Sequence, residues 1–134
     1  QKPVILHSRN AFDETMEILG DFQGQLKRAV FHCYGGTALQ AKTLLELGYY
    51  ISFTGVITFK NASLAREAVA AVPLERMMVE TDCPYMSPDP MRKQKINEPA
   101  LMVHTAAKIA EIKNVGYETA CDALTKTTEE FFTI

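Results

Sequence analysis

The feature that most constrains the fold of this chain is a set of short apolar segments that each end at a histidine or a carboxylate. The segment PVIL ends at His7, AVF ends at His32, and MMV leads to Glu80 and Asp82. Short, β-branched apolar runs of this kind are typical of buried strands in a parallel sheet. In α/β barrels the carboxyl ends of the strands gather the active site on one face. The pattern therefore predicts that two histidines and an aspartate meet there, as in part of a catalytic metal centre.

Helical patterns alternate with these segments. Asn10 is placed to cap a first helix, and Thr37 with Gln40 forms a capping-box pattern at the start of a second helix, which Gly48 ends. The other expected elements are helices over residues 11–19 and 63–71 and strands over residues 49–53 and 77–81. Four strand–helix units with short connections predict an α/β fold with a parallel sheet and right-handed crossovers.

The last third of the chain has a different pattern. A long polar loop over residues 87–96 precedes a helix expected over residues 98–113, with Asn97 as its cap and Gly116 at its end. An amphipathic helix is expected from Tyr117, followed by one more short turn near Thr127. The two phenylalanines at 131 and 132 are expected to dock against the body of the protein.

Length and composition indicate one globular domain over residues 1–134. The chain is 47% hydrophobic and 22% charged, with a formal net charge of −2. This charge argues against broad, non-specific nucleic-acid coating, which usually needs a basic protein. No apolar stretch approaches the roughly 20 residues of a membrane helix, so no membrane contact is expected. Three cysteines without zinc-ribbon spacing favour reduced thiols and a cytoplasmic location.

A family resemblance rests on five segments in chain order: PVILHSRNA, FHCYGGT, YYISFTGVITF, LERMMVETDCPY and NEPALMVHTAAKIAEIK. Together they closely resemble the TatD-type deoxyribonucleases, which belong to the metal-dependent hydrolases built on (β/α)8 barrels. The resemblance runs through essentially the whole chain. It implies a TIM-type barrel, of which residues 1–134 supply about the last four βα units and the C-terminal helices.

The resemblance covers only half of such a barrel. A complete barrel takes about 250 residues, and this chain resembles the family from the fifth strand onward. The family's opening His-x-His pair and its glutamate on the fourth strand have no counterpart here. We therefore expect the domain to be incomplete alone and to need the N-terminal half of the barrel or another chain. The inward side chains of its strands should otherwise form a large exposed apolar patch.

The two histidines have alternative interpretations. Taken alone, either imidazole could simply satisfy a backbone carbonyl. The resemblance implies instead that His7 and His32 bind one ion of a two-metal pair. It also allows Arg9 to steer a phosphate, although an arginine after a strand is as often merely solvated. Cys33 should face the opposite side of a regular strand and pack there, without binding metal.

Glu80 and Asp82 are two residues apart, so in a strand both side chains would lean to the same face. Carboxylates at a strand end can also cap the next helix or pair with a lysine. Close like charges favour a bound cation, because each otherwise raises the pKa of the other. The resemblance implies that Asp82 binds the second metal and takes a proton from the attacking water, and that Glu80 orients it.

The polar loop after Asp82 carries Arg92, Lys93 and Lys95. These cations could form an ordinary solvated loop or a phosphate-binding lip above the metals. The family commonly has R-G-x-R at this point, whereas this chain lacks the glycine and has Ile96 in place of an arginine.

The sequence thus predicts a hydrolase that uses two divalent ions, Zn²⁺, Mn²⁺ or Mg²⁺, to cleave phosphodiester bonds. DNA as the substrate rests on the resemblance alone. An amidase or lactonase acting on a small molecule is an alternative, since the same ligands can polarise a carbonyl. A second alternative is a half-barrel that contributes packing or partner contacts without chemistry.

Overall fold

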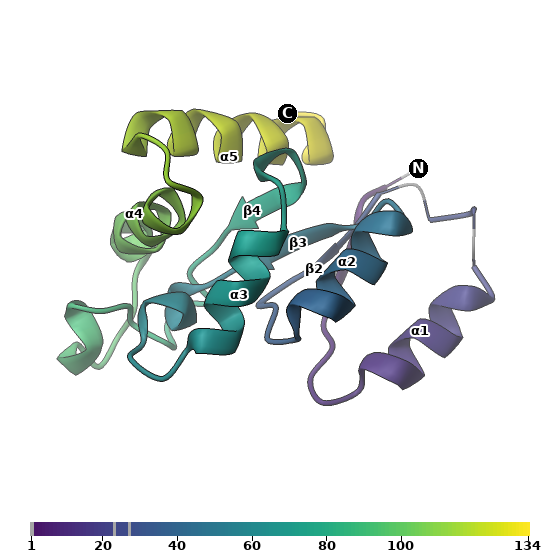
Figure 1. The fold of residues 1–134 in the computed structure, drawn as a ribbon, viewed down its shortest axis with the longest axis horizontal. Helices are drawn as coiled ribbons and strands as arrows, with labels where there is room; N and C mark the ends of the chain where they lie inside the picture. Colours follow the sequence, from purple (N-terminus) through teal and green to yellow (C-terminus); the bar gives the residue numbers. More distant parts are fainter. Residues whose placement is uncertain (1, 23, 27) are drawn as a thin grey trace.

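The fold is a parallel sheet whose strands alternate with helices (Figure 1). The computed structural model describes residues 2–22, 24–26 and 28–134. Its strands are β1 (Val4–Leu6), β2 (Ala29–Phe31), β3 (Tyr50–Phe53) and β4 (Met77–Val79). They lie in the order β1-β2-β3-β4 and every pairing is parallel, which confirms the predicted α/β class. These four strands form an open sheet with β1 and β4 at its edges.

Helices connect the strands and extend the chain after β4. The three connecting helices lie on one side of the sheet in Figure 1, and the two C-terminal helices lie beyond β4. They are α1 (Phe12–Gly20), α2 (Ala38–Glu46), α3 (Ser63–Ala71), α4 (Met102–Lys113) and α5 (Tyr117–Phe132). Short 3-10 turns are η1 (Gly55–Thr58), η2 (Leu74–Arg76), η3 (Met91–Lys93) and η4 (Pro99–Leu101). Within the described residues, every helix is too short or too polar to cross a membrane.

Local signals predicted the second helix well and the first less well. The capping box of α2 is present, with Thr37 accepting from the N–H of Gln40 and the Gln40 side chain accepting from the N–H of Thr37. Gly48 follows with a φ of 82°, a left-handed conformation that glycine adopts without strain. The prediction that Asn10 caps α1 is wrong, because the N-cap is Ala11 and no side chain caps this helix.

The C-terminal helices differ from the expected ones in their ends. The helix expected from residue 98 begins with η4 and becomes α-helical only at Met102. It ends at Lys113, followed by the C-cap Asn114 in a left-handed conformation, and Gly116 is instead the N-cap of α5. The helix α5 then continues to Phe132, so the separate short turn expected near Thr127 is part of it.

The main core lies between the sheet and the connecting helices. Alternate strand residues such as Ile51 and Phe53 are fully buried against Leu44 of α2 and Val69 of α3. Burying one such side chain stabilises the fold by about 1.5–3 kcal/mol. This packing fixes which face of each strand points toward the helices.

The opposite face of the sheet is covered in part by the end of α5. Phe131 packs with Val30 and Met78 in a second cluster, and these residues are 0%, 3% and 4% exposed. The expected docking of the C-terminal phenylalanines is therefore confirmed for Phe131. The expectation that this face is broadly uncovered is wrong, since Ile5, at 59% exposure, is the one strongly exposed residue among the strands described.

The loops that follow β3 and β4 are held together at the carboxyl end of the sheet. The Thr58 hydroxyl accepts a hydrogen bond from the backbone N–H of Asp89 at 2.8 Å and donates to the carbonyl of Gly55 at 2.6 Å. At Gly55 the two loops approach each other closely. A Cβ added to Gly55 would lie 2.9 Å from the carbonyl oxygen of Met86 and 2.9 Å from the Cβ of Pro88. The two loops therefore behave as one packed unit.

This close approach predicts that Gly55→Ala destabilises the complete protein by about 1–3 kcal/mol, because the backbone of the facing loop must shift. The measurement is the free energy of unfolding in urea. Gly20→Ala is the control, since nothing lies within 4 Å of the Cβ it adds, and alanine at this helical position should leave the protein as stable as the parent or up to about 1 kcal/mol more stable. If Gly55→Ala unfolded at the parent's urea concentration, the proposed packing of the two loops would be incorrect.

Candidate metal centre

The register of β1 and β2 places His7 beside His32. The last paired residues are Leu6 and Phe31, so the next residue of each chain is a histidine. The ladder continues one step further, because the N–H of His32 donates to the carbonyl of Leu6 at 3.0 Å. The two rings are 5.1 Å apart between centroids, and the Nδ1 of His7 lies 2.9 Å from the Nε2 of His32. The structure thus brings these two histidines together, as the sequence predicted.

Glu80 supports His32 from the other side. The Oε2 of Glu80 lies 3.3 Å from the Nδ1 of His32, and its Oε1 accepts a hydrogen bond from the backbone N–H of Cys33. When Nδ1 of His32 donates to Glu80, the Nε2 of that ring is left with its lone pair directed at His7. We expected Glu80 to orient Asp82; the contacts found for it are to His32 and Cys33.

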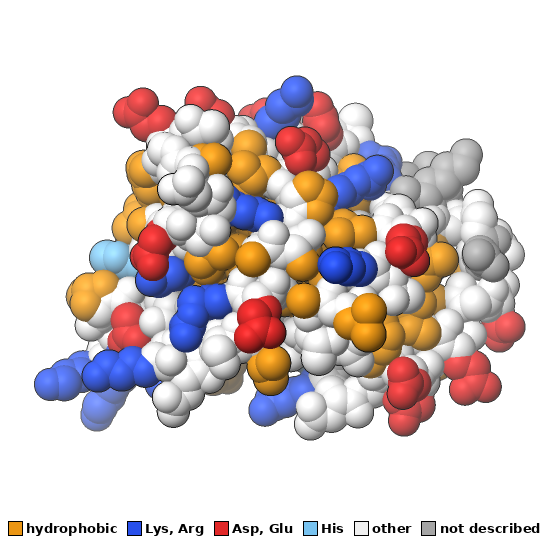
Figure 2. Space-filling view, viewed as in Figure 1, with side chains coloured by type: hydrophobic (Ala, Val, Ile, Leu, Met, Phe, Trp, Pro, Cys, Tyr) orange, Lys and Arg blue, Asp and Glu red, His pale blue; other side chains and the backbone are white. Residues whose placement is uncertain are grey.

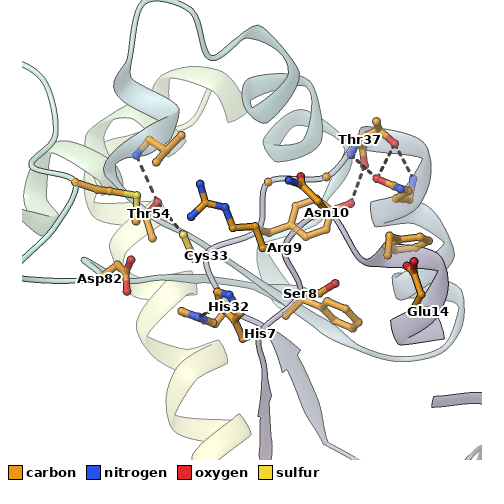
Figure 3. Close-up of a pocket in the computed structure, with 18 of the residues that line it drawn as sticks. His7, Ser8, Arg9, Asn10, Glu14, His32, Cys33, Thr37, Thr54 and Asp82 are labelled. Carbon is orange, nitrogen blue, oxygen red and sulfur yellow. Dashed lines mark hydrogen bonds between the residues drawn. The ribbon is translucent and has the colours of Figure 1, made fainter. Parts of the chain in front are cut away.

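Asp82 reaches the same cavity through an irregular backbone. The strand β4 ends at Val79, and Asp82 has a φ of 55°, so the alternation of a regular strand does not set the direction of its side chain. Asp82 lines a cavity of about 710 Å³ together with His7 and His32. Figure 3 shows the carboxylate of Asp82 and the two imidazoles approaching this space from different strand ends.

Arg9 lines this cavity as well, in agreement with its predicted position (Figure 3). The charge of Arg9 is one of several that shift the pKa of the Cys33 thiol. Burial raises the pKa of the Cys33 thiol, and the charges of Asp82 and Glu80 raise it further, while a hydrogen bond to Thr54 and the charge of Arg9 lower it. Because its pKa is raised above the ordinary thiol value, Cys33 stays a thiol near neutral pH.

The predicted orientation of Cys33 is wrong. His32 and Cys33 line the same cavity, whereas strand alternation would place them on opposite faces. The reason is that β2 ends at Phe31 and Cys33 has a φ of 48°, which turns its side chain back toward the cavity. Sequence reasoning also missed Thr54, which lines the cavity at the end of β3. The rule that located the histidines, a polar residue directly after an apolar strand, would have found it.

Arg92 and Lys93 lie elsewhere. They line a second cavity of about 510 Å³, along with Lys95 and Phe59, and the guanidinium carbon of Arg92 lies 3.5 Å from the centroid of the Phe59 ring. The residue that lines both cavities is Met86. The predicted phosphate-binding lip is therefore a separate basic site next to the first cavity.

The donors in the first cavity fit part of a metal centre. Two imidazole nitrogens that face each other at 2.9 Å need a proton or a cation between them. A carboxylate behind a metal-binding histidine is the usual support for such a ligand. Among the residues that the structure describes, however, no three His, Cys, Asp or Glu side chains are gathered closely enough to hold an ion. The chain therefore fits two imidazole ligands with a carboxylate nearby, which is part of a metal centre.

Comparison with known proteins decides the family. The family model described as TatD related DNase matches residues 1–133. The chain belongs to the TatD related DNase family. It is 34% identical over 132 residues to the uncharacterized metal-dependent hydrolase YabD of Bacillus subtilis, covering 98% of this chain and 51% of that protein. It is 40% identical over 133 residues to the uncharacterized metal-dependent hydrolase YcfH of Escherichia coli, and the match covers 99% of this chain and 50% of that protein.

Solved structures agree with this assignment. The crystal structure of YjjV, a TatD homolog from Escherichia coli, superposes with a TM-score of 0.89 at 30% identity over 98% of this chain and 50% of that one. A TatD-family hydrolase from Entamoeba histolytica has the same fold, with a TM-score of 0.85 at 20% identity over 97% of this chain and 50% of that one. The chain thus spans about half the length of the relatives it matches.

The contact between Glu80 and His32 predicts a role in metal binding. Glu80→Gln keeps the size and one oxygen acceptor but removes the charge that supports the imidazole. We expect the affinity of the complete protein for Zn²⁺ or Mn²⁺ to fall by about 10–100-fold, measured by isothermal titration calorimetry. Glu129→Gln, on the exposed surface of α5, is the control. An affinity equal to that of the parent would show that Glu80 does not support a metal ligand.

Proposed function

We propose that the complete protein is a divalent-metal-dependent hydrolase that cleaves phosphodiester bonds, as a TatD-like deoxyribonuclease. The observation that carries this proposal is that His7 and His32 contact each other and share one cavity with Asp82, while Glu80 supports His32 from behind. Family membership adds support, since the similar proteins above are named metal-dependent hydrolases.

Two divalent ions would complete the site. His7 and His32 would bind one ion and Asp82 the other, and imidazole with carboxylate ligands suits Zn²⁺, Mn²⁺ or Mg²⁺. Bound ions of this kind supply an activated water and neutralise charge on the phosphate. Asp82 would accept the proton of that water, and Glu80 would hold His32 in the tautomer that leaves Nε2 free.

Positive charge next to the site favours a phosphodiester over an amide or a lactone. Arg9 lines the cavity of the histidines, and Arg92 and Lys93 line the adjoining one. A neutral amide or lactone gains little from three cations, whereas a phosphodiester carries a charge that they can pair with. We assign all three residues to substrate binding, with DNA as the proposed substrate.

Completion of the site requires more protein than this chain contains. We propose that the four strands belong to an eight-stranded barrel, with the N-terminal half of the protein or another chain supplying the missing strands and ligands. Among the strands that the structure describes, β1 is an edge strand that pairs with β2 alone, so it offers one place for such strands to pair. Three free cysteines support the proposal that the protein works in the cytoplasm.

The decisive variant is Asp82→Asn in the complete protein. Asparagine tolerates the left-handed backbone at this position, so folding should be retained while the charge and the proton acceptor are lost. We expect phosphodiesterase activity on single-stranded DNA to fall by about 10²–10⁴-fold, the range for loss of a general base.

The matched control is Asp122→Asn, which removes an equal charge from the exposed surface of α5. It should retain the activity of the parent. Activity of Asp82→Asn close to that of the parent would place the catalytic carboxylate elsewhere. A parent protein with all its metals and no activity on any phosphodiester would overturn the proposed function.

A further inference from the structure

Asp82 lies in a segment that has left the sheet. The N–H of Glu80 still donates to the carbonyl of Phe53 at 3.0 Å, one step beyond the end of β4. Asp82 follows with a φ of 55°, a left-handed conformation that a residue other than glycine keeps only where surrounding contacts fix it. In Figure 3 the Asp82 carboxylate forms no hydrogen bond with the other described residues drawn, so its place in the cavity is set by its backbone.

One residue, Asn97, bonds this segment on both sides of Asp82. Its Nδ2 donates to the carbonyl of Thr81 at 2.9 Å and to the carbonyl of Tyr85 at 2.7 Å. Its backbone N–H donates to the carbonyl of Pro84 at 2.9 Å. Asn97 thus holds the segment at three carbonyls, one directly before Asp82 and two shortly after it.

The remaining hydrogen bonds of this segment are local. The N–H of Tyr85 donates to the carbonyl of Asp82 at 3.0 Å, and the N–H of Cys83 donates to the Thr81 hydroxyl at 3.3 Å. In the part of the chain that the structure describes, the hydrogen bonds from residues 81–85 to other segments all go to Asn97. The left-handed turn at Asp82 therefore has Asn97 as its anchor.

Asn97 is itself well fixed. It is 3% exposed, and its Oδ1 accepts a hydrogen bond from the N–H of Glu98 at 2.9 Å, just before η4. Both kinds of amide group are therefore used, the N–H donors by the segment of Asp82 and the oxygen by the turn that follows. An aspartate of the same shape would keep the acceptor and lose both donors, because an ionised carboxylate only accepts.

Asn97 also closes the loop that follows Asp82. Residues 89–96 of this loop are partly or fully exposed. Figure 2 shows Lys and Arg side chains at the end of the molecule where Figure 1 places the loop between β4 and α4. Asn97 is buried where the loop returns to the body of the protein. The anchor of Asp82 thus lies in the interior, away from the solvated part of the loop.

We infer that Asn97 is a positioning residue, which sets the place of the Asp82 carboxylate in the cavity through the backbone and not by contact with the substrate. This inference rests on the proposed function, since that function assigns an ion to Asp82. It predicts a selective effect, because loss of the two donors of Asn97 should weaken binding of the ion at Asp82. The ion at His7 and His32 should be retained, since the pairing of β1 with β2 holds these histidines.

The first test is Mn²⁺ binding to the complete protein, measured by isothermal titration calorimetry. Asp82→Asn identifies the binding event that depends on Asp82. We expect Asn97→Asp to weaken the same event by about 10–100-fold, the range for groups that orient metal ligands, and to leave the other event unchanged. Asn114→Asp makes the same chemical change at the exposed end of α4 and should leave both events unchanged.

A double-mutant cycle separates positioning from a purely structural role. If Asn97 acts through Asp82, adding Asn97→Asp to Asp82→Asn should change Mn²⁺ binding no further, although each substitution alone weakens it. Equal losses in both backgrounds would overturn the inference, since they would show that Asn97 affects the site independently of Asp82. Asn97→Ser, which buries no charge, is the second variant and takes the place of Asn97→Asp in every measurement if the latter does not fold.

A crystal structure of the metal-free Asn97→Asp protein separates failure of this inference from failure of the proposed function. We expect the Asp82 carboxylate to move by about 1 Å or more, a displacement large enough to impair catalysis, while His7 and His32 stay in place. An Asp82 that keeps its position in the variant would overturn the inference. If Asp82→Asn leaves both Mn²⁺ binding events unchanged, the proposed role of Asp82 fails, and the crystal structure still decides whether Asn97 positions it.

Discussion

The carboxyl-end face of the sheet acquires its chemistry from the register in which β1 pairs with β2. With Leu6 opposite Phe31, the residues that follow are His7 and His32, and their ring nitrogens meet at 2.9 Å. A slip of one residue would turn one imidazole to the opposite face. The buried strand residues prevent such a slip, because it would move them out of the core. Core packing and the approach of the histidines are thus parts of one constraint.

The parts of the structure that the sequence predicted are those set by local patterns. Apolar runs located all four strands, and the polar residues after three of these runs located His7, His32 and Glu80 at the same end of the sheet. The capping box of Thr37 with Gln40 marked the start of α2 correctly. Such signals are readable because they lie within a few residues of each other and because parallel strands end at one edge.

The parts that escaped prediction depend on backbone irregularity or on long-range contacts. Cys33 turns toward the cavity because its φ is positive just after β2 ends, which a rule of strand alternation cannot express. Asn97 was expected to cap a helix, but it is buried and its amide donates to the carbonyls of Thr81 and Tyr85. The stack of Arg92 on Phe59 joins two loops that are far apart in the chain, so no short sequence pattern predicts it.

The central claim is that His7 and His32 bind one divalent ion in the complete protein. A crystal structure of that protein grown with Zn²⁺ and measured at the zinc absorption edge tests it directly. The account predicts an anomalous peak for a zinc ion that lies about 2.0–2.1 Å from one imidazole nitrogen of His7 and from one of His32. Glu80 should still contact the Nδ1 of His32. A fully occupied zinc site that excludes either histidine would contradict it.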